Sequence, residues 1–150
     1  MTNWLTDEQQ RDWRAWLAAS SLLANQLDRD LQTDAGLSLA DYEILVRLSE
    51  AQDRRIRMSE LAELTLSSRS RLSHQIDRMA KAGLVTRELC TEDRRGSFAV
   101  LTDAGWRTLV NAAPAHVESV RTHLVDVLTP AEFSALGKAC AKIADRLSAD

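Results

Sequence analysis

Apolar residues near both ends of the chain recur at three- and four-residue steps, the spacing of one face of an α-helix. The N-terminal repeat follows the capping-box sequence TDEQ at residues 6–9, and the C-terminal repeat follows TPAE at residues 129–132. The first comprises Trp13, Leu17, Ser20, Ala24, Leu27 and Leu31. The second comprises Phe133, Leu136, Cys140, Ile143 and Leu147. The pattern predicts a long amphipathic helix at each end.

Further helix starts divide the middle of the chain. Gly36 ends the first helix, and Ser38 begins another that contains SLADYEILVRLSEA. The short run IRM then precedes SELAELTL, a tight connection at residues 65–67 and a second helix that ends at Gly83. TDAG at residues 102–105 begins a helix expected to reach about residue 128, with a kink at Pro114.

One segment has the pattern of a β-hairpin. VTRELC at residues 85–90 and SFAVL at residues 97–101 are strand-like, and the polar run between them contains Gly96. The tip would carry Arg94 and Arg95. A charged tip is often only solvated, so its meaning depends on the flanking sequence. The fold class predicted is mainly α, with a two-stranded β wing.

The helix before this hairpin has two different faces. Leu72, Ile76 and Met79 fall on one side and are predicted to face the core. The opposite side carries mainly hydroxyl and basic residues, with one acidic residue among them: Ser67, Ser70, Arg71, His74, Asp77, Arg78 and Lys81. Such a face fits a DNA major groove and offers hydrogen-bond donors to base edges. A merely solvated face would more typically alternate Glu with Lys.

Charge is distributed unevenly along the 150 residues. The net charge is −3, but residues 54–95 hold ten Lys and Arg against six Asp and Glu, a net +4. A basic block between acidic flanks is the asymmetry expected when one region faces phosphate, although an ordinary surface can also show it. The 45% hydrophobic content and low Gly and Pro counts fit a globular helical protein. No apolar run has membrane-spanning length and no secretion signal is seen, so we expect a cytoplasmic protein.

The hairpin and its neighbours resemble the multiple-antibiotic-resistance regulator (MarR) family. The family's wing pattern is matched by Asp93, Arg95, Gly96, Leu101 and Thr102. The resemblance implies one winged helix-turn-helix domain over residues 1–150. Its DNA-binding part would span about 38–101, and its helical dimerisation part about 5–33 and 102–148. It also implies a homodimeric repressor of transcription that binds a pseudo-palindromic double-stranded operator.

The resemblance assigns roles to particular residues. Arg95, with Arg94, would enter the minor groove while Asp93 holds an arginine in position and Gly96 completes the wing. Gln75 lies nearer the buried side and would brace the helix. The predicted recognition-helix contacts are Ser67, Ser68, Ser70, Arg71, His74, Gln75 and Arg78. The predicted dimer interface contains Leu17, Leu27, Phe133, Leu136, Cys140, Ile143 and Leu147. On periodicity alone, the same stripes would equally suit packing within one subunit.

A small, often aromatic or phenolic, effector is also implied by the resemblance. Its candidate pocket residues are Trp13, Trp16, Tyr42 and His116, although tryptophans at helical spacing equally suit an apolar interface. No metal or other cofactor is predicted, since His116 and His123 lack further ligands. Whether Cys90 has a redox role is left open.

The sequence also bears on two other classes of function. The chain has no glycine-rich phosphate loop, nucleophile elbow or His-Glu-x-x-His helix, so no enzyme is predicted. A winged helix used only for protein contacts or dimerisation, without DNA binding, is the alternative. It would favour a recognition face and wing depleted of cations, and this sequence has cations at both.

Overall fold

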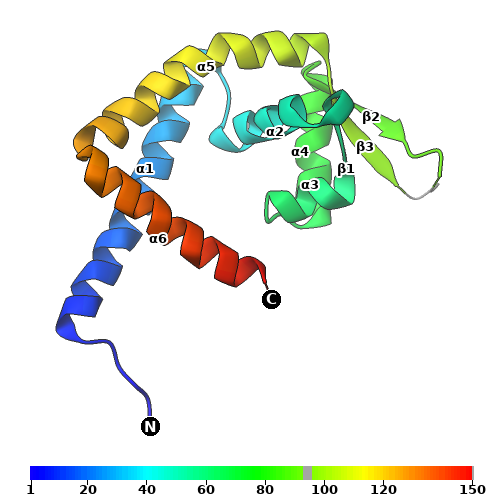
Figure 1. Cartoon of the computed structure of the whole chain (residues 1–150). Helices are drawn as coiled ribbons and strands as arrows, with labels where there is room; N and C mark the ends of the chain where they lie inside the picture. The colour runs from blue at the N-terminus through cyan, green and yellow to red at the C-terminus, as the bar shows by residue number, and fades with distance from the viewer. Residues whose placement is uncertain (93–95, 150) are drawn as a thin grey trace. The chain divides into compact units, whose positions relative to one another are not determined.

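The computed structural model describes residues 1–92 and 96–149 (Figure 1). It confirms a mainly α fold with a small antiparallel sheet. The helices are α1 (Asp7–Ala35), α2 (Leu39–Glu50), α3 (Met58–Leu64), α4 (Arg69–Lys81), α5 (Asp103–His123) and α6 (Pro130–Ser148). The strands are β1 (Arg55–Arg57), β2 (Val85–Leu89) and β3 (Ser97–Leu101). Short 3-10 turns occupy Gln52–Arg54 and Val125–Val127.

The chain forms two compact units. One comprises residues 28–114 and is called the winged unit below; it contains the predicted DNA-binding part, about 38–101. The other comprises residues 1–27 and 115–150 and is called the helical unit. Helices α1 and α5 each contribute residues to both units.

The winged unit contains a three-stranded sheet in the order β1-β3-β2. β2 and β3 pair antiparallel, with Arg87 opposite Ala99, as expected of the predicted hairpin (Figure 1). β1 pairs antiparallel with the other edge of β3, so the predicted short strand joins the hairpin. The central strand β3 carries Ala99 and Leu101 into the core, because alternate residues of a strand face the same side.

The core of the winged unit lies between the sheet and helices α2, α3 and α4. The α4 residues predicted to be buried, Leu72, Ile76 and Met79, are each at most 1% exposed. They belong to one cluster with Ile44 and Leu48 of α2. Burying such a side chain stabilises a fold by about 1.5–3 kcal/mol. The orientation of α4 is therefore fixed by apolar packing.

The junction between α4, the hairpin and α5 is held by backbone-directed hydrogen bonds. Gly83 has a φ of +80°, and the Leu84 N–H donates to the Met79 carbonyl at 3.1 Å, which closes α4 as predicted. The Thr102 hydroxyl donates to the Gly83 carbonyl at 2.6 Å and accepts from the Gly105 N–H at 2.9 Å. A Cβ at Gly105 would clash with the Leu84 carbonyl, so the Leu-Thr pair and Gly105 together fix where α5 begins.

Several predicted boundaries were wrong. α3 runs from Met58 to Leu64 and not from Ser59 to Leu66, because Leu66 adopts a left-handed φ of 52° that a helix cannot continue through. α5 ends at His123 and not near residue 128, since Leu124 is non-helical and a 3-10 turn follows. The first strand is Arg55–Arg57, one residue earlier than IRM. Cys90 is buried beyond the end of β2.

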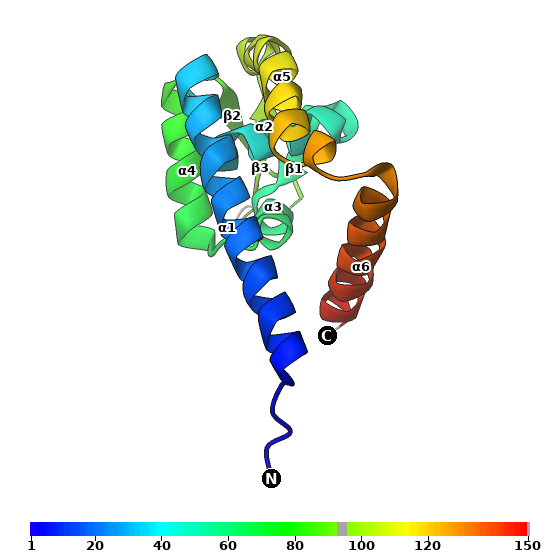
Figure 2. The same cartoon turned by 90° about the vertical axis from the view of Figure 1, so that its left-hand side faces the viewer.

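The helical unit contains the capped start of α1 and the whole of α6, the two helices that the repeats predicted. Thr6 and Gln9 form the reciprocal bonds of a capping box before α1. Thr129 and Glu132 do the same before α6, which Figure 2 displays as one uninterrupted helix. α5 continues through Pro114. Within the described ranges, 1–92 and 96–149, no helix combines the length and apolar character needed to cross a membrane.

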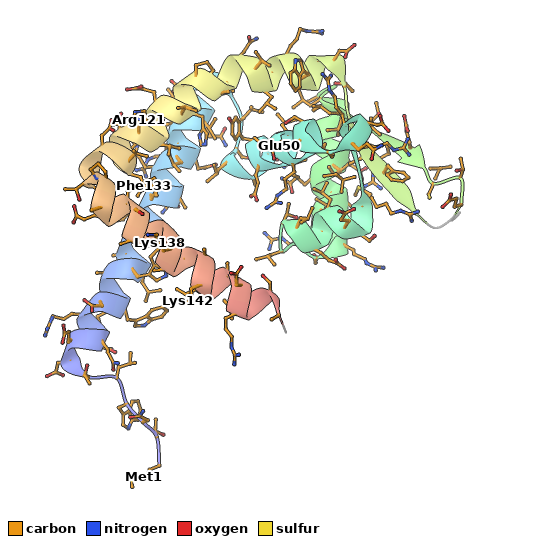
Figure 3. The ribbon with its side chains drawn as sticks, viewed as in Figure 1. Met1, Glu50, Arg121, Phe133, Lys138 and Lys142 are labelled. Atoms are coloured by element: carbon orange, nitrogen blue, oxygen red, sulfur yellow. The ribbon has the colours of Figure 1, made fainter. Side chains whose placement is uncertain are left out.

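Side chains on α6 remain accessible along its full length. The helix has no buried residue, and Phe133, Ile143 and Leu147 are 38%, 55% and 71% exposed. Figure 3 labels Phe133 near the start of α6 and Lys138 and Lys142 further along it. The predicted apolar stripe is thus formed but uncovered in the single chain.

Candidate nucleic-acid interface

Helices α3 and α4 form a helix-turn-helix with a sharply defined turn. Thr65 closes α3, Leu66 takes the left-handed conformation, and Ser68 caps α4 by accepting from the Arg71 N–H at 3.2 Å. The Ser67 N–H donates to the Ala62 carbonyl at 2.9 Å, which draws the turn back onto α3. These contacts set the direction in which α4 leaves the turn.

The outer face of α4 is polar and accessible. Ser70, Arg71 and His74 are exposed, whereas Ser67 and Gln75 are half-buried. A cleft of about 670 Å³ lies beside this face, between α4, the turn and α2. It brings together five of the predicted recognition residues: Ser67, Arg71, His74, Gln75 and Arg78. Ser68 acts as the helix cap, and Ser70 is exposed without lining the cleft.

A buried carboxylate that the sequence pattern did not reveal anchors this face. Asp41 of α2 is 7% exposed and accepts hydrogen bonds from the Arg78 Nη1 at 2.7 Å and Nη2 at 3.2 Å. The Gln75 amide donates to the same carboxylate at 2.9 Å. The bracing role predicted for Gln75 agrees with this bond. Arg78 remains 61% exposed although it is paired, so its guanidinium is oriented at the surface by Asp41.

Electrostatics favour the ionised form of this pair. Burial alone would raise the pKa of Asp41, but the hydrogen bonds from Arg78 and Gln75 and the charge of Arg78 outweigh it and lower that pKa. The carboxylate in turn raises the pKa of Arg78. Asp41 lies in the first turn of α2, where an acidic side chain is common because it interacts favourably with the helix dipole. Only the fold places Asp41 beside α4.

The wing is stiffened by arginines at its base. The Arg87 Nη2 donates to the Ser73 hydroxyl of α4 at 2.7 Å and lies 3.1 Å from the Asp77 carboxylate. The Arg55 guanidinium lies 3.9 Å from the centre of the Phe98 ring and pairs with Glu88 at 3.3 Å. The Arg87 contacts tie the hairpin to the recognition helix, and the Arg55 contacts join β1 to the hairpin. Of the predicted wing residues, Gly96 accepts from the Cys90 N–H at 2.9 Å, and Asp93, Arg94 and Arg95 lie outside the described residues.

The four predicted effector residues fall in both units. Trp13, Trp16 and His116 belong to the helical unit, and Tyr42 belongs to the winged unit. Trp13 and Trp16 are 48% and 44% exposed, whereas Tyr42 is buried. Burial raises the pKa of Tyr42 and lowers that of His116. None of the four lines the cleft beside α4.

The structure offers no candidate metal site within residues 1–92 and 96–149. No group of three or more His, Cys, Asp or Glu side chains there is arranged to hold an ion. Cys90 and Cys140 are free thiols, the first buried and the second half-buried.

A helix-turn-helix with an accessible polar recognition helix, followed by a hairpin fastened to it, defines a winged-helix protein. The MarR family model matches residues 35–96, which run from the last residue of α1 to the residue before β3. AbsC, a MarR family transcriptional regulator from Streptomyces coelicolor, is 52% identical, with 99% of this chain and 100% of that chain covered and a TM-score of 0.92. This chain belongs to the MarR family.

Two other relatives extend the comparison. Sco3205, a MarR family regulator from Streptomyces coelicolor solved in complex with DNA, is 46% identical over 97% of this chain and 92% of that chain, with a TM-score of 0.92. YetL, an HTH-type transcriptional repressor from Bacillus subtilis, is 32% identical over 85 residues, or 57% of this chain. The chain spans about half the length of this curated relative, 51%. Family membership makes the chain a DNA-binding transcriptional regulator and not an enzyme.

Proposed function

We propose that the chain is a sequence-specific, homodimeric repressor that binds a pseudo-palindromic DNA duplex and is released by a small ligand. The DNA-binding part of this proposal rests on one observation, which is that α4 has one apolar face and one polar face. Leu72, Ile76 and Met79 hold one side in the core, so the hydroxyl, arginine and histidine side chains must face outward. A helix of this kind fits the major groove.

The predicted residues then divide by role. Ser67, Ser70, Arg71 and His74 are the proposed contacts to bases and neighbouring phosphates. Arg78 is held by Asp41 but keeps an accessible guanidinium, so it contributes positive charge at a fixed place. Arg94 and Arg95 are the proposed minor-groove contacts, because the narrow groove concentrates negative potential, and Asp93 is proposed to hold an arginine in position. Ser68 contributes through its cap and Gln75 through its bond to Asp41.

A DNA-binding titration tests this proposal. Genomic fragments that the protein retains would supply the duplex, and fluorescence anisotropy would supply the affinity. Arg71→Ala and Arg95→Ala should each weaken specific binding by about 1–3 kcal/mol, the range for one good groove contact. Arg107→Ala, at an exposed position on α5, is the control and should bind as the native protein does. Unchanged affinity in both groove variants would remove these two contacts from the proposal, whereas no binding to any duplex would favour a protein-interaction module instead.

The proposed homodimer rests on uncovered apolar surface in the helical unit. Trp13, Leu17, Phe133, Ile143 and Leu147 are each at least 38% exposed in the single chain. Leu27, Leu136 and Cys140 are half-buried. A second copy that covers these stripes would remove large apolar groups from water, which is the dominant driving force for association. A two-fold dimer would present two recognition helices to half-sites about one DNA turn apart.

Paired variants on α6 test the dimer. Leu136→Glu places a charge in the proposed interface and should yield monomers or aggregates in sedimentation. Lys138→Glu changes the charge by more, but Lys138 lies two residues further along α6 and therefore on the opposite side of the helix, so this variant should remain dimeric. A dimeric Leu136→Glu protein with native DNA affinity would refute the α6 interface.

Repression and ligand release are the remaining parts of the proposal. Repression is supported by YetL, which is named a repressor. Ligand release is proposed through Trp13, Trp16, Tyr42 and His116, whose rings suit a small aromatic acid or phenol. A thermal-shift panel of such compounds should raise the melting temperature for a true effector. The same compound should lower operator affinity, and a Trp16→Ala variant should lose both effects. A flat panel would remove the effector from the proposal.

A further inference from the structure

A second cleft in the winged unit lies on the hairpin side of the recognition helix. It has a volume of about 390 Å³ and is formed where the start of α3, the first turns of α4 and the base of the hairpin meet. Its polar lining consists of Arg57, Ser59, Arg69, Ser73, Arg87 and Ser97. Three arginines and three hydroxyls line the cleft, and no acidic residue is among its lining residues. Their combination is suited to an oxyanion.

One of the three arginines, Arg87, is held in a fixed orientation. The Arg87 Nη2 donates to the Ser73 carbonyl at 3.0 Å and to its hydroxyl at 2.7 Å. The Asp77 carboxylate lies 3.1 Å from the same nitrogen and compensates part of the charge of Arg87. Arg87 therefore forms a rigid wall that joins β2 to α4.

The other two arginines keep their charge available. Within residues 1–92 and 96–149, no carboxylate is placed within ion-pair distance of Arg57 or Arg69. The Arg57 guanidinium lies 5.4 Å from the centre of the Phe98 ring, which limits its motion without neutralising it. Arg69 is exposed at the first position of α4. Two guanidinium groups that have no ion-pair partner among the described residues thus line a cleft whose third arginine is already fixed.

The shape of a DNA duplex determines which part of the DNA would occupy this cleft. A major groove and its neighbouring minor groove are separated by one sugar-phosphate backbone. A protein that inserts α4 into the first groove and the hairpin into the second must therefore straddle that backbone. The cleft lies between these two elements, and Arg is suited to phosphate because its planar fork donates two parallel hydrogen bonds.

We propose that Arg57, Arg69 and Arg87 form a phosphate clamp on the DNA strand that separates the two grooves. This inference rests on the proposed function, because it assumes that α4 and the hairpin enter neighbouring grooves. The clamp carries no sequence information of its own. It would fix the depth and register of α4, so that base contacts by Arg71 and His74 are made at the correct position.

A salt titration with paired variants tests the clamp. Arg57→Gln, Arg69→Gln and the double variant would be compared with the native protein on its genomic duplex and on an unrelated duplex. The slope of log affinity against log salt should become shallower by about 0.9 for each lost phosphate contact. Counterion release alone then predicts an affinity loss of roughly eightfold per contact at 0.1 M salt. Because phosphates are common to all sequences, both duplexes should lose affinity by the same factor.

Two controls keep the result interpretable. Arg107→Gln removes the same charge from an exposed position on α5 and should leave the slope unchanged. Thermal unfolding should show that the clamp variants remain folded, since no hydrogen bond of the Arg57 or Arg69 side chain would be lost within the described ranges. If the native protein binds DNA with a steep salt dependence and the double variant has the same slope, the clamp is refuted while the proposed function stands. If the native protein binds no duplex, both fail.

A free phosphate ion presents the same oxygen acceptors as a DNA phosphate and is the other ligand that this cleft would suit. The melting temperature of the native protein and of the double variant would be measured in inorganic phosphate and in chloride at equal ionic strength. If the cleft receives phosphate only as part of a duplex, the difference in melting temperature between the two salts should be the same for both proteins. A phosphate-dependent stabilisation that is present in the native protein and absent from the double variant would make the cleft a free-anion site and overturn its assignment to DNA.

Discussion

Removing the charge of Asp41 should destabilise the winged unit by an amount that the structure allows us to estimate. In Asp41→Asn the side chain keeps its size, but one carboxylate oxygen becomes an amide that donates. That amide would face the Arg78 guanidinium or the Gln75 amide, both of which also donate. Hydrogen bonds to charged groups contribute about 1.5–3 kcal/mol, and the 61% exposure of Arg78 reduces this through solvent screening.

The expected loss is therefore about 1–2 kcal/mol at neutral pH, or roughly 2–8 °C in melting temperature for a domain of this size. Urea unfolding at one fixed protein concentration would measure it, because a dimer makes stability depend on concentration. Glu43→Gln is the matched control on the same helix. Glu43 pairs with Arg47 at 3.0 Å, but the Glu43 side chain is 50% exposed, so its loss should cost at most about 1 kcal/mol.

The difference between Asp41→Asn and the native protein should also depend on pH. The folded-state pKa of Asp41 lies below its ordinary value of 3.8, so folding favours the ionised form. This contribution is present above pH 3.8 and is lost as pH falls through the folded-state pKa. The two unfolding curves should converge in that acidic range. An Asp41→Asn protein as stable as Glu43→Gln at neutral pH, or a gap that widens in acid, would refute the reasoning.

Three further substitutions have expected outcomes. Gly105→Ala should lower the unfolding free energy by about 3 kcal/mol, because the new Cβ would meet the Leu84 carbonyl, a backbone atom that cannot move aside. A melting temperature equal to the native value would contradict the packing of α5. Ser68→Ala should cost about 1 kcal/mol in urea unfolding through loss of the α4 cap, while exposed Ser70→Ala should leave stability unchanged. Thr102→Val, which removes a donor to Gly83 and an acceptor for Gly105, should cost about 1–3 kcal/mol by the same measurement, and a native value would show that the hydroxyl does not secure the junction.

Much of the fold was accessible from local sequence because its signals act over a few residues. The capping boxes at Thr6 and Thr129 begin helices where the pattern predicted. Gly83 ends the recognition helix through its positive φ, which few other residues adopt at low cost. The three- and four-residue spacing of Leu72, Ile76 and Met79 predicted the buried face of α4, because a helix repeats every 3.6 residues.

Other boundaries depended on backbone states that composition does not specify. Leu66 is apolar and would extend a helix by propensity, yet the turn holds it at a φ of 52°. The end of α5 at His123 is set by a non-helical Leu124, whose side chain gives no terminating signal. Tertiary context overrode local preference at both places.

For the candidate interface, local spacing in the sequence predicted the outward chemistry of α4 and the position of the hairpin, since both follow from residues within one short segment. Only the tertiary structure brought Asp41 to Arg78 across 37 positions and gathered Arg57, Arg69 and Arg87 around one cleft. The physical reason is that hydrogen bonds and charge interactions depend on distances in space. Residues from separate elements reach those distances only after the apolar core has fixed how the helices and strands pack.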